Sequence, residues 1–262
     1  MKRLRAWLVV VAVAAAIAPT LPACTQGEGT GKVVGTLNAP LCWTGPFELD
    51  ADFLAAVPYR EGLQIRIQSG SDFESFSDGL SILLYDIGKV RPDPATGFAG
   101  LYGQPLAVDL PPEVTPPGVP VKAVADPALV SLTLYLGRSC RTENVTLHAA
   151  REVTLPTDPE DRTCDAPLVA GVDPTTGCDP GKEAPAGVGS GKSLLTFTDV
   201  FDGKLDEPQA AQRLTAGCFD VYLADPRDGA PGGLGPPPRC RGHVRGSFSF
   251  YFERGRPSQP FP

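Results

Sequence analysis

The sequence predicts an all-β protein, an antiparallel β-sandwich with long Pro/Gly-rich loops and little helix. Several short segments alternate apolar and polar residues, which is typical of strands with one buried face and one wet face. The 29 prolines and 29 glycines favour turns and long loops over long helices. Short strands separated by frequent turn signals are the pattern of a β-sandwich.

The expected strands differ in how clearly the sequence marks them. Residues 63–68 alternate strictly between apolar and polar side chains. Residues 79–87 have apolar side chains at both odd and even positions, which indicates a central strand covered on both faces. In residues 242–252, Val244, Phe248, Phe250 and Phe252 share one face, opposite Ser247, Ser249 and Tyr251. Further strands are expected at residues 32–37, 130–136, 144–155, 193–201 and 216–224.

The segments between these strands lack a clear period. Residues 41–58 are predicted to be a packed irregular segment with one helical turn near Phe53. Residues 88–103 are predicted to be a loop because they contain prolines and glycines. Residues 111–120 hold five prolines and should form an extended linker, the one place where the domain could be subdivided. Residues 207–214 are the best helix candidate.

Residues 1–23 have the features of a secretory signal. Lys2, Arg3 and Arg5 form a basic start, an apolar run covers residues 6–18, and Leu-Pro-Ala-Cys ends at Cys24. This ending resembles the lipobox of bacterial lipoproteins. In that family the cysteine thiol is joined to diacylglycerol and the signal is cut just before it. The resemblance implies that Cys24 is the lipidated first residue of the mature chain.

The same resemblance suggests where the protein is held. In this family an Asp after the cysteine retains the protein in the inner membrane, whereas Thr25 follows here. The resemblance therefore implies a lipid anchor in the outer membrane, facing the periplasm or the exterior. Residues 24–31 are expected to be a lipidated tether and residues 32–262 a single domain. Gly-Ser-Phe-Ser-Phe at residues 246–250, after a Gly/Pro loop, resembles the end of β-rich bacterial surface lipoproteins, which transfers no active residue.

The cysteine count predicts three disulfide bonds. If Cys24 carries lipid, six of the seven cysteines remain, and an even number in an exported chain indicates disulfides. These six are Cys42, Cys140, Cys164, Cys178, Cys218 and Cys240.

Strand geometry argues against one of the short bridges. If residues 216–224 pair with residues 242–252, Cys218 lies opposite a residue near Gly246. Cys240 is then displaced by about six residues, or roughly 20 Å at the rise of a strand, whereas a disulfide needs Cα atoms within ~7 Å.

We predict instead a bond between Cys164 and Cys178, which flank a Pro/Gly-rich acidic segment. Two longer-range bonds would then join Cys42 to either Cys218 or Cys240, and Cys140 to the other. The alternative is that residues 225–239 fold back and bring Cys240 to Cys218.

Two motifs bear on ligands. Residues 186–193 match a relaxed phosphate-binding loop, but prolines precede the loop and a strand-like segment follows it, so we interpret the match as a flexible loop. Residues 157–183 are rich in Asp and Glu, and calcium is an alternative left open there, although the EF-hand spacing is missing. We expect no metal and no cofactor.

No catalytic residue stands out. Gly-x-Ser-x-Gly and His-Glu-x-x-His are absent from the sequence. His148 and His243 are interpreted as surface or packing residues. A carboxylate pair for glycoside hydrolysis needs proximity only in space, so it stays an alternative. The aromatic residues that could line a binding face are Trp43, Tyr59, Tyr85, Tyr102 and Tyr251.

The net charge and the expected location in the cell envelope together favour a binding or structural role. The formal net charge is −7, and removal of the basic signal makes the mature chain more acidic still, which disfavours nucleic-acid partners. We therefore expect a lipid-anchored, non-enzymatic cell-envelope protein that contacts the membrane through Cys24 and has a glycan or protein partner. The alternative is an envelope polysaccharide hydrolase that uses a carboxylate pair.

Overall fold

The computed structural model describes most of the chain between residues 26 and 252. The described residues are 26–39, 42–69, 77–110, 128–140, 145–158, 160–167, 169–170, 172, 178, 183–184, 187–188, 190–201, 213–228 and 236–252. Their strands are β1 (Gln26–Ala39), β2 (Trp43–Asp50), β3 (Phe53–Tyr59), β4 (Gly62–Ser69), β5 (Asp78–Leu84), β6 (Leu106–Ala107), β7 (Val130–Leu136), β8 (Thr146–Ala149), β9 (Asp165–Ala166), β10 (Val169–Ala170), β11 (Glu183–Ala184), β12 (Gly187–Val188), β13 (Leu194–Asp199), β14 (Leu214–Ala224) and β15 (Gly242–Phe252).

Helical structure in the described residues is limited to short 3₁₀ segments. These are η1 (Ile87–Lys89), η3 (Arg162–Cys164) and η5 (Pro226–Asp228). None of the helices described is both long enough and apolar enough to cross a membrane. The prediction of an all-β fold with little helix is therefore confirmed.

One 11-stranded sheet forms the body of the protein. Its neighbours follow the order β15-β1-β3-β4-β5-β7-β8-β14, and β14 pairs again with β15, so the sheet curls back on itself. These pairings are antiparallel. Mostly, strands that follow one another in the chain are neighbours in the sheet, as short connections favour.

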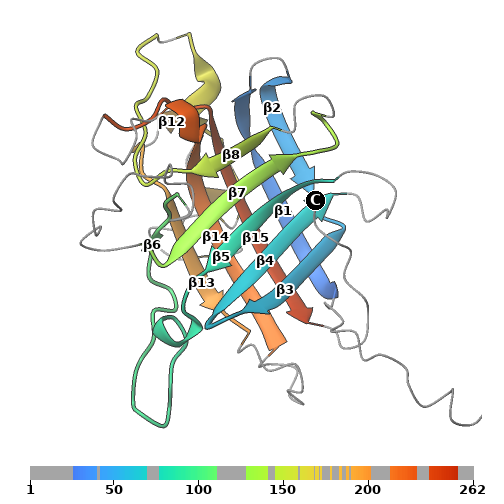
Figure 1. The fold of residues 1–262 in the computed structure, drawn as a ribbon, viewed down its shortest axis with the longest axis vertical. Helices are drawn as coiled ribbons and strands as arrows, with labels where there is room; N and C mark the ends of the chain where they lie inside the picture. Colours follow the sequence, from blue (N-terminus) through green and yellow to red (C-terminus); the bar gives the residue numbers. More distant parts are fainter. Residues whose placement is uncertain are drawn as a thin grey trace, which may run out of the picture.

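The curled sheet makes two layers that face each other. Strands β3, β4, β5 and β7 cross in front of β1, β14 and β15 (Figure 1). The layers meet where β1 pairs with β3 and where β8 pairs with β14, each over two residue pairs. The antiparallel sandwich that the sequence predicts is thus built from one continuous curled sheet.

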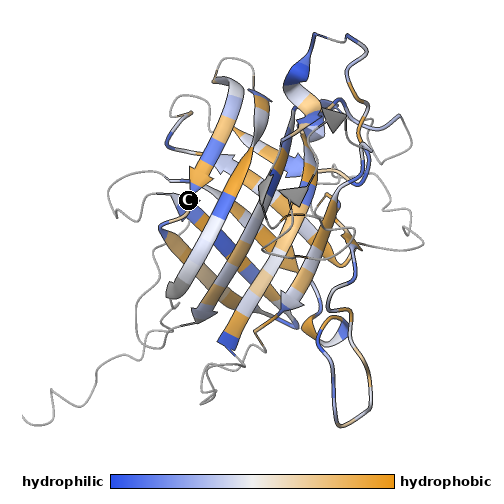
Figure 2. Cartoon of the chain, turned by 180° about the vertical axis from the view of Figure 1, so that it is seen from behind, coloured by the Kyte–Doolittle hydropathy of each residue, from blue (hydrophilic) through white to orange (hydrophobic). Residues whose placement is uncertain are grey.

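Apolar side chains fill the space between the layers. In β4, Leu63, Ile65 and Ile67 are 0% exposed, and the intervening Gln64 and Arg66 are partly exposed on the other face. The same alternation of apolar and polar positions runs along other strands (Figure 2). Full burial of one such side chain contributes about 1.5–3 kcal/mol relative to leaving it in water. The core between the layers is therefore the main source of stability.

Two glycines on the inner face of β1 let the strands approach closely. A Cβ added to Gly35 would lie 2.1 Å from the carbonyl oxygen of His243, on β15. A Cβ on Gly31 would meet side chains of Leu54 and Ile67. Gly35 therefore requires the absence of a side chain, whereas a Cβ at Gly31 would need the neighbouring side chains to shift slightly.

Two expectations about local structure change. The irregular segment with a helical turn near Phe53 was wrong, because residues 43–50 and 53–59 form β2 and β3. The alternation in β2, with Phe47 and Leu49 buried and Glu48 exposed, is masked in the sequence by the glycine and proline beside it. β1 begins at Gln26, so most of the expected tether belongs to the sheet. The predicted linker at residues 111–120 and residues 207–212 of the expected helix lie outside the described residues, and Leu214 begins β14.

The disulfide connectivity differs from the prediction. The bonds are Cys42–Cys140, Cys164–Cys240 and Cys178–Cys218, with Cα–Cα distances of 5.3, 6.5 and 5.7 Å. The predicted Cys164–Cys178 bond was therefore wrong, and so were the predicted partners of Cys42 and Cys140.

The physical reason is the path of the segment that carries Cys164 and Cys178. Cys218 lies opposite Ser247, next to Gly246, as predicted, and does not bond Cys240. Cys164 bonds to Cys240, just before β15, and Cys178 bonds to Cys218, in β14. The segment is therefore attached at two separate places and does not close on itself. Three disulfides place the folded chain in an oxidising compartment outside the cytoplasm.

Candidate functional site

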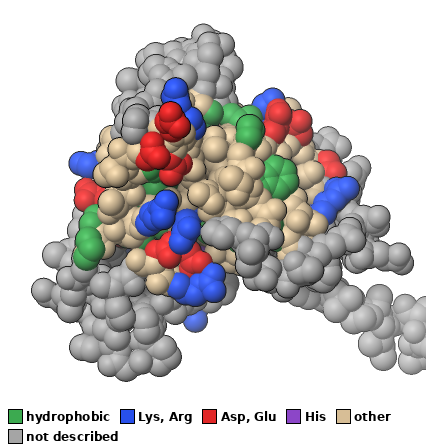
Figure 3. Space-filling view, turned by 90° about the horizontal axis from the view of Figure 1, so that it is seen from above, with side chains coloured by type: hydrophobic (Ala, Val, Ile, Leu, Met, Phe, Trp, Pro, Cys, Tyr) green, Lys and Arg blue, Asp and Glu red, His purple; other side chains and the backbone are tan. Residues whose placement is uncertain are grey.

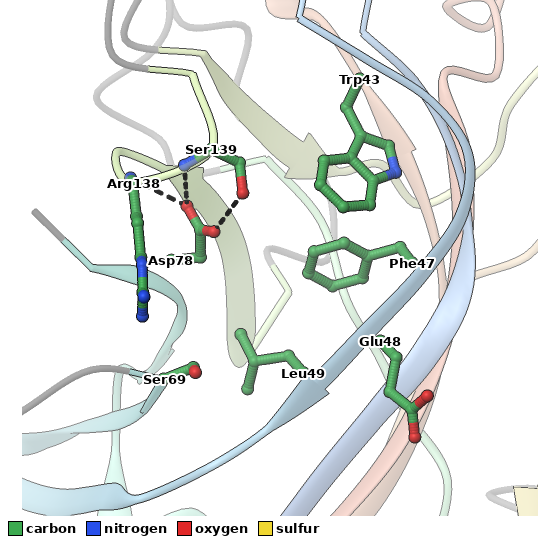
Figure 4. Close-up of a pocket in the computed structure, with 8 residues that line it drawn as sticks. All are labelled: Trp43, Phe47, Glu48, Leu49, Ser69, Asp78, Arg138 and Ser139. Carbon is green, nitrogen blue, oxygen red and sulfur yellow. Dashed lines mark hydrogen bonds between the residues drawn. The ribbon is translucent and has the colours of Figure 1, made fainter.

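A groove of about 180 Å³ lies between β2 and the ends of β4, β5 and β7 (Figure 4). It is open to the surface and has both apolar and polar walls. We call it the Trp43 groove, and its lining residues are Trp43, Phe47, Glu48, Leu49, Ser69, Asp78, Arg138 and Ser139.

The wall from β2 is aromatic. Trp43 packs edge-on against Phe47, with ring centroids 5.9 Å apart and planes at 83°. The indole Nε1–H of Trp43 donates to the carbonyl oxygen of Pro46 at 3.1 Å, so its orientation is fixed within β2. Phe47 is only 4% exposed, whereas Trp43 is partly exposed, so the indole forms the accessible part of this wall.

The opposite wall is held by Asp78, the first residue of β5. Its Oδ1 accepts hydrogen bonds from the backbone N–H groups of Arg138 and Ser139 at 2.9 and 3.0 Å. Its Oδ2 accepts from the Ser139 hydroxyl at 2.5 Å. One carboxylate therefore fixes the turn that follows β7, as the dashed lines in Figure 4 show.

A disulfide joins the two walls. Cys42 directly precedes Trp43, and Cys140 directly follows Ser139, so the Cys42–Cys140 bond connects the start of β2 to the turn after β7. Cys140 is itself buried, at 3% exposed. Because both walls are fixed before any ligand arrives, binding loses little conformational entropy.

The edge of β2 also faces the groove. Among the described strands, β2 pairs with β1 alone. The N–H of Ala51 donates to Gly31, and hydrogen-bonded pairs alternate along an antiparallel ladder. Phe47 and Leu49 therefore bond to β1, while the backbone N–H and C=O of Glu48 point away from β1.

The Glu48 side chain lies on the other face of β2. Its carboxylate forms an ion pair with Lys32 on β1, with Nζ and Oε1 2.7 Å apart. This contact raises the pKa of Lys32 through a hydrogen bond and charge attraction. Glu48 thus presents its backbone to the Trp43 groove while its charge is paired outside it.

A second polar cluster lies under the segment that contains β9. His243 is 0% exposed, its Nε2 contacts Asp220, and its Nδ1 lies 3.1 Å from the carbonyl oxygen of Cys164. Arg245 donates from Nε to Asp220 at 2.6 Å and from Nη1 to the carbonyl of Pro167 at 3.0 Å.

This cluster fastens residues 164–167 to β14 and β15, together with the Cys164–Cys240 bond. Both ring nitrogens of His243 have protein partners, and Tyr222 stacks on the ring with centroids 3.9 Å apart. His243 is therefore a packing residue, as predicted. His148 is half-buried beside Thr133, and burial lowers its pKa.

The phosphate-loop match has a structural explanation. Strand β13, and no helix, follows residues 190–193. Ser193 is 1% exposed; its hydroxyl donates to Ala150 at 2.6 Å and accepts from the N–H of Tyr222 at 3.0 Å. The side chain that would bind Mg²⁺ in a phosphate loop is thus occupied in the core.

Of the acidic segment at residues 157–183, only parts are described. Asp161 accepts from the N–H of Thr163 and Asp165 pairs with Arg162, so these carboxylates stabilise the turn at η3. No group of three metal-binding side chains occurs among the residues that the structure describes.

Three other predicted aromatic residues, Tyr85, Tyr102 and Tyr251, do not line the groove. Tyr85 donates to Ser131, and Tyr102 accepts from the N–H of Val200. Tyr251 is 46% exposed on β15, and the side chain of Tyr59 lies outside the description. Trp43 is therefore the predicted aromatic residue that the fold places in a groove. Ser69, Asp78, Arg138 and Ser139 were missed, because no local pattern marks them.

The surface seen from above carries both signs of charge (Figure 3). Lys and Arg side chains lie beside Asp and Glu, and hydrophobic side chains form small separate groups on its described part. The ion pairs of the described residues include Arg241–Asp228, 2.5 Å apart, and Arg227–Asp225. Such a face creates no single-sign field of the kind that attracts nucleic acid.

Comparison with known proteins finds no matching family model, no similar curated protein and no similar solved structure. The functional argument therefore depends on the chain's own residues.

Proposed function

We propose that this protein is a lipid-anchored, non-enzymatic binding protein of the bacterial cell envelope, held in the outer membrane by lipid on Cys24. The Leu-Pro-Ala-Cys sequence supports the anchor, and the three disulfides support a location outside the cytoplasm. The observation that carries the binding role is the Trp43 groove, in which a partly exposed indole faces a polar wall and Cys42–Cys140 joins the two.

The arrangement of carboxylates favours binding over the hydrolase alternative. A glycoside hydrolase needs two carboxyl groups aimed at one bond, one to donate a proton and one to attack or activate water. In the groove, both oxygens of Asp78 accept hydrogen bonds from Arg138 and Ser139, and the carboxylate of Glu48 pairs with Lys32. These groups support the groove's shape, which suits a protein that holds its ligand unchanged.

The anchor is tested by Cys24→Ser. Serine has no thiol to accept the lipid, so the variant should incorporate no labelled palmitate and should keep its signal uncleaved. The wild-type protein should incorporate the label and sediment with outer-membrane vesicles. Label in the Cys24→Ser protein would refute the anchor.

The binding role is tested separately with a secreted form that starts at Thr25 and retains every described residue. Sedimentation with isolated envelope measures the bound fraction. Trp43→Ala should weaken binding about tenfold, which corresponds to about 1.4 kcal/mol. Tyr251→Ala is the matched control, because it removes an exposed aromatic side chain on β15, outside the groove. Equal binding by both variants would count against the groove as the binding site.

A further inference from the structure

We infer that the Trp43 groove binds an uncharged sugar ring of an envelope glycan. This inference rests on the proposed binding function and assigns its ligand class. The argument uses the indole face, the polar groups around it, their balance of charge and the size of the groove.

The indole offers a face and no free donor. Its N–H is already bonded to Pro46, and the edge-on contact with Phe47 holds the ring in place. One face of a pyranose ring carries C–H groups and is apolar, so it can cover a fixed aromatic surface and exclude water from it. A ligand that needs a hydrogen bond from the indole would find none.

The polar groups suit hydroxyls, which both donate and accept. The backbone of Glu48 supplies one N–H and one C=O at the unpaired edge of β2. Ser69 lines the groove with a hydroxyl, and Arg138 adds a guanidinium (Figure 4). Hydroxyl groups around a sugar ring can use all of these partners, because each is one donor and two acceptors.

The charges in the groove are balanced and disfavour an ionic ligand. Asp78 and Arg138 have opposite signs on the same wall, and the carboxylate of Asp78 already accepts three hydrogen bonds. The carboxylate of Glu48 pairs with Lys32 outside the groove. An anion would meet Asp78, and a cation would find no free carboxylate, so a neutral ligand loses the least on leaving water.

The same edge is unsuited to an extended peptide. Strand addition needs a row of free backbone donors and acceptors. Pro46 has no N–H, its carbonyl accepts from Trp43, and Gly45 has a φ of +117° that breaks the extended line. Past Pro46, the backbone groups of β2 that point away from β1 are those of Glu48 and Asp50, a short edge that a compact ligand can use and a long continuous strand cannot.

The size of the groove matches a single ring. A protein cavity of about 150 Å³ can hold one benzene molecule, and the Trp43 groove measures about 180 Å³. Because it is open, a longer glycan could place one ring in the groove and extend outside.

Trp43 itself is the reporter for the test. The chain has two tryptophans, Trp7 and Trp43, so the tryptophan emission of the secreted form that starts at Thr25 comes from the groove only. The form is titrated with chitotriose and isomaltotriose as neutral saccharides, trigalacturonate as an acidic one and tetra-alanine as a peptide. We expect a saturable change in emission with at least one neutral saccharide and none with trigalacturonate or tetra-alanine.

Arg138→Gln, an exposed substitution, should weaken the saccharide response about tenfold, whereas Arg91→Gln in the loop after β5 should leave it unchanged. A saturable response to trigalacturonate or tetra-alanine alone would overturn the sugar assignment. Absence of any saccharide response would also overturn it. A different result would refute the proposed binding function: Trp43→Ala would leave the fraction that sediments with the envelope unchanged.

Discussion

Removing the Cys42–Cys140 bond with the double substitution Cys42→Ala/Cys140→Ala should cost more stability than removing the Cys178–Cys218 bond. The bond joins residues 98 apart in the chain, compared with 76 for Cys164–Cys240 and 40 for Cys178–Cys218. Closing a loop of ~100 residues in the unfolded chain stabilises the folded state by about 4.7 kcal/mol, and a loop of ~40 residues by about 3.9 kcal/mol. We therefore expect a loss of about 4.7 kcal/mol.

The same substitution should also loosen the Trp43 groove. The bond connects the residue before Trp43 to the residue after Ser139, so its removal frees one wall from the other. Native Trp43 emission should shift to longer wavelength as water reaches the indole, and saccharide affinity should fall because the walls are no longer fixed in advance. The Cys178→Ala/Cys218→Ala variant should lose stability without either change.

Urea unfolding, followed by far-ultraviolet circular dichroism and extrapolated linearly to water, measures both variants on one scale. The fluorescence of the folded proteins is recorded before denaturant is added. A loss below about 2 kcal/mol for the Cys42/Cys140 pair, or a loss smaller than that of the Cys178/Cys218 pair, would refute the loop-closure argument. An unchanged Trp43 spectrum would refute the role of the bond in shaping the groove.

Two ionisable side chains give further predictions. Burial lowers the pKa of His148 below its ordinary value of 6.5, partly offset by the charge of Asp225. The unfolded chain therefore binds the proton more readily, so the unfolding free energy should fall as the pH drops below about 6.5, and His148→Gln should reduce this slope in urea unfolding between about pH 8 and about pH 5. Burial raises the pKa of Tyr222 to about 12. Tyr222→Phe should therefore leave the phenolate absorbance of the folded protein unchanged at about pH 10, where an ordinary tyrosine is half ionised, and a decrease there would contradict the burial argument.

The short-range pattern of the sequence was sufficient for most of the sheet. Residues 130–136 and 242–252 were predicted with the bounds of β7 and β15, and residues 63–68 lie within β4. The reason is that buried and exposed side chains alternate along a strand with one buried face, so a few consecutive residues are enough to indicate it. β2 was not predicted because Gly45 and Pro46 interrupt that alternation.

The candidate site depends on contacts that no local pattern encodes. Trp43 could be selected as an aromatic candidate, but Asp78 and Arg138 reach it only because the sheet curls and brings the end of β7 to β2. The sequence shows Cys42 and Cys140 but not their pairing. Had the pairing been known, it would have indicated that the two walls of the groove lie close together, because each cysteine is next to a residue of one wall.

Composition determined that the chain is all-β, and the cysteine count predicted three disulfides. Tertiary structure decided which cysteines meet and where a groove opens, because both depend on strand register and on the curl that closes β14 onto β15. Register is set by burial across the whole sheet, so residues distant in the chain become neighbours only after the core has formed.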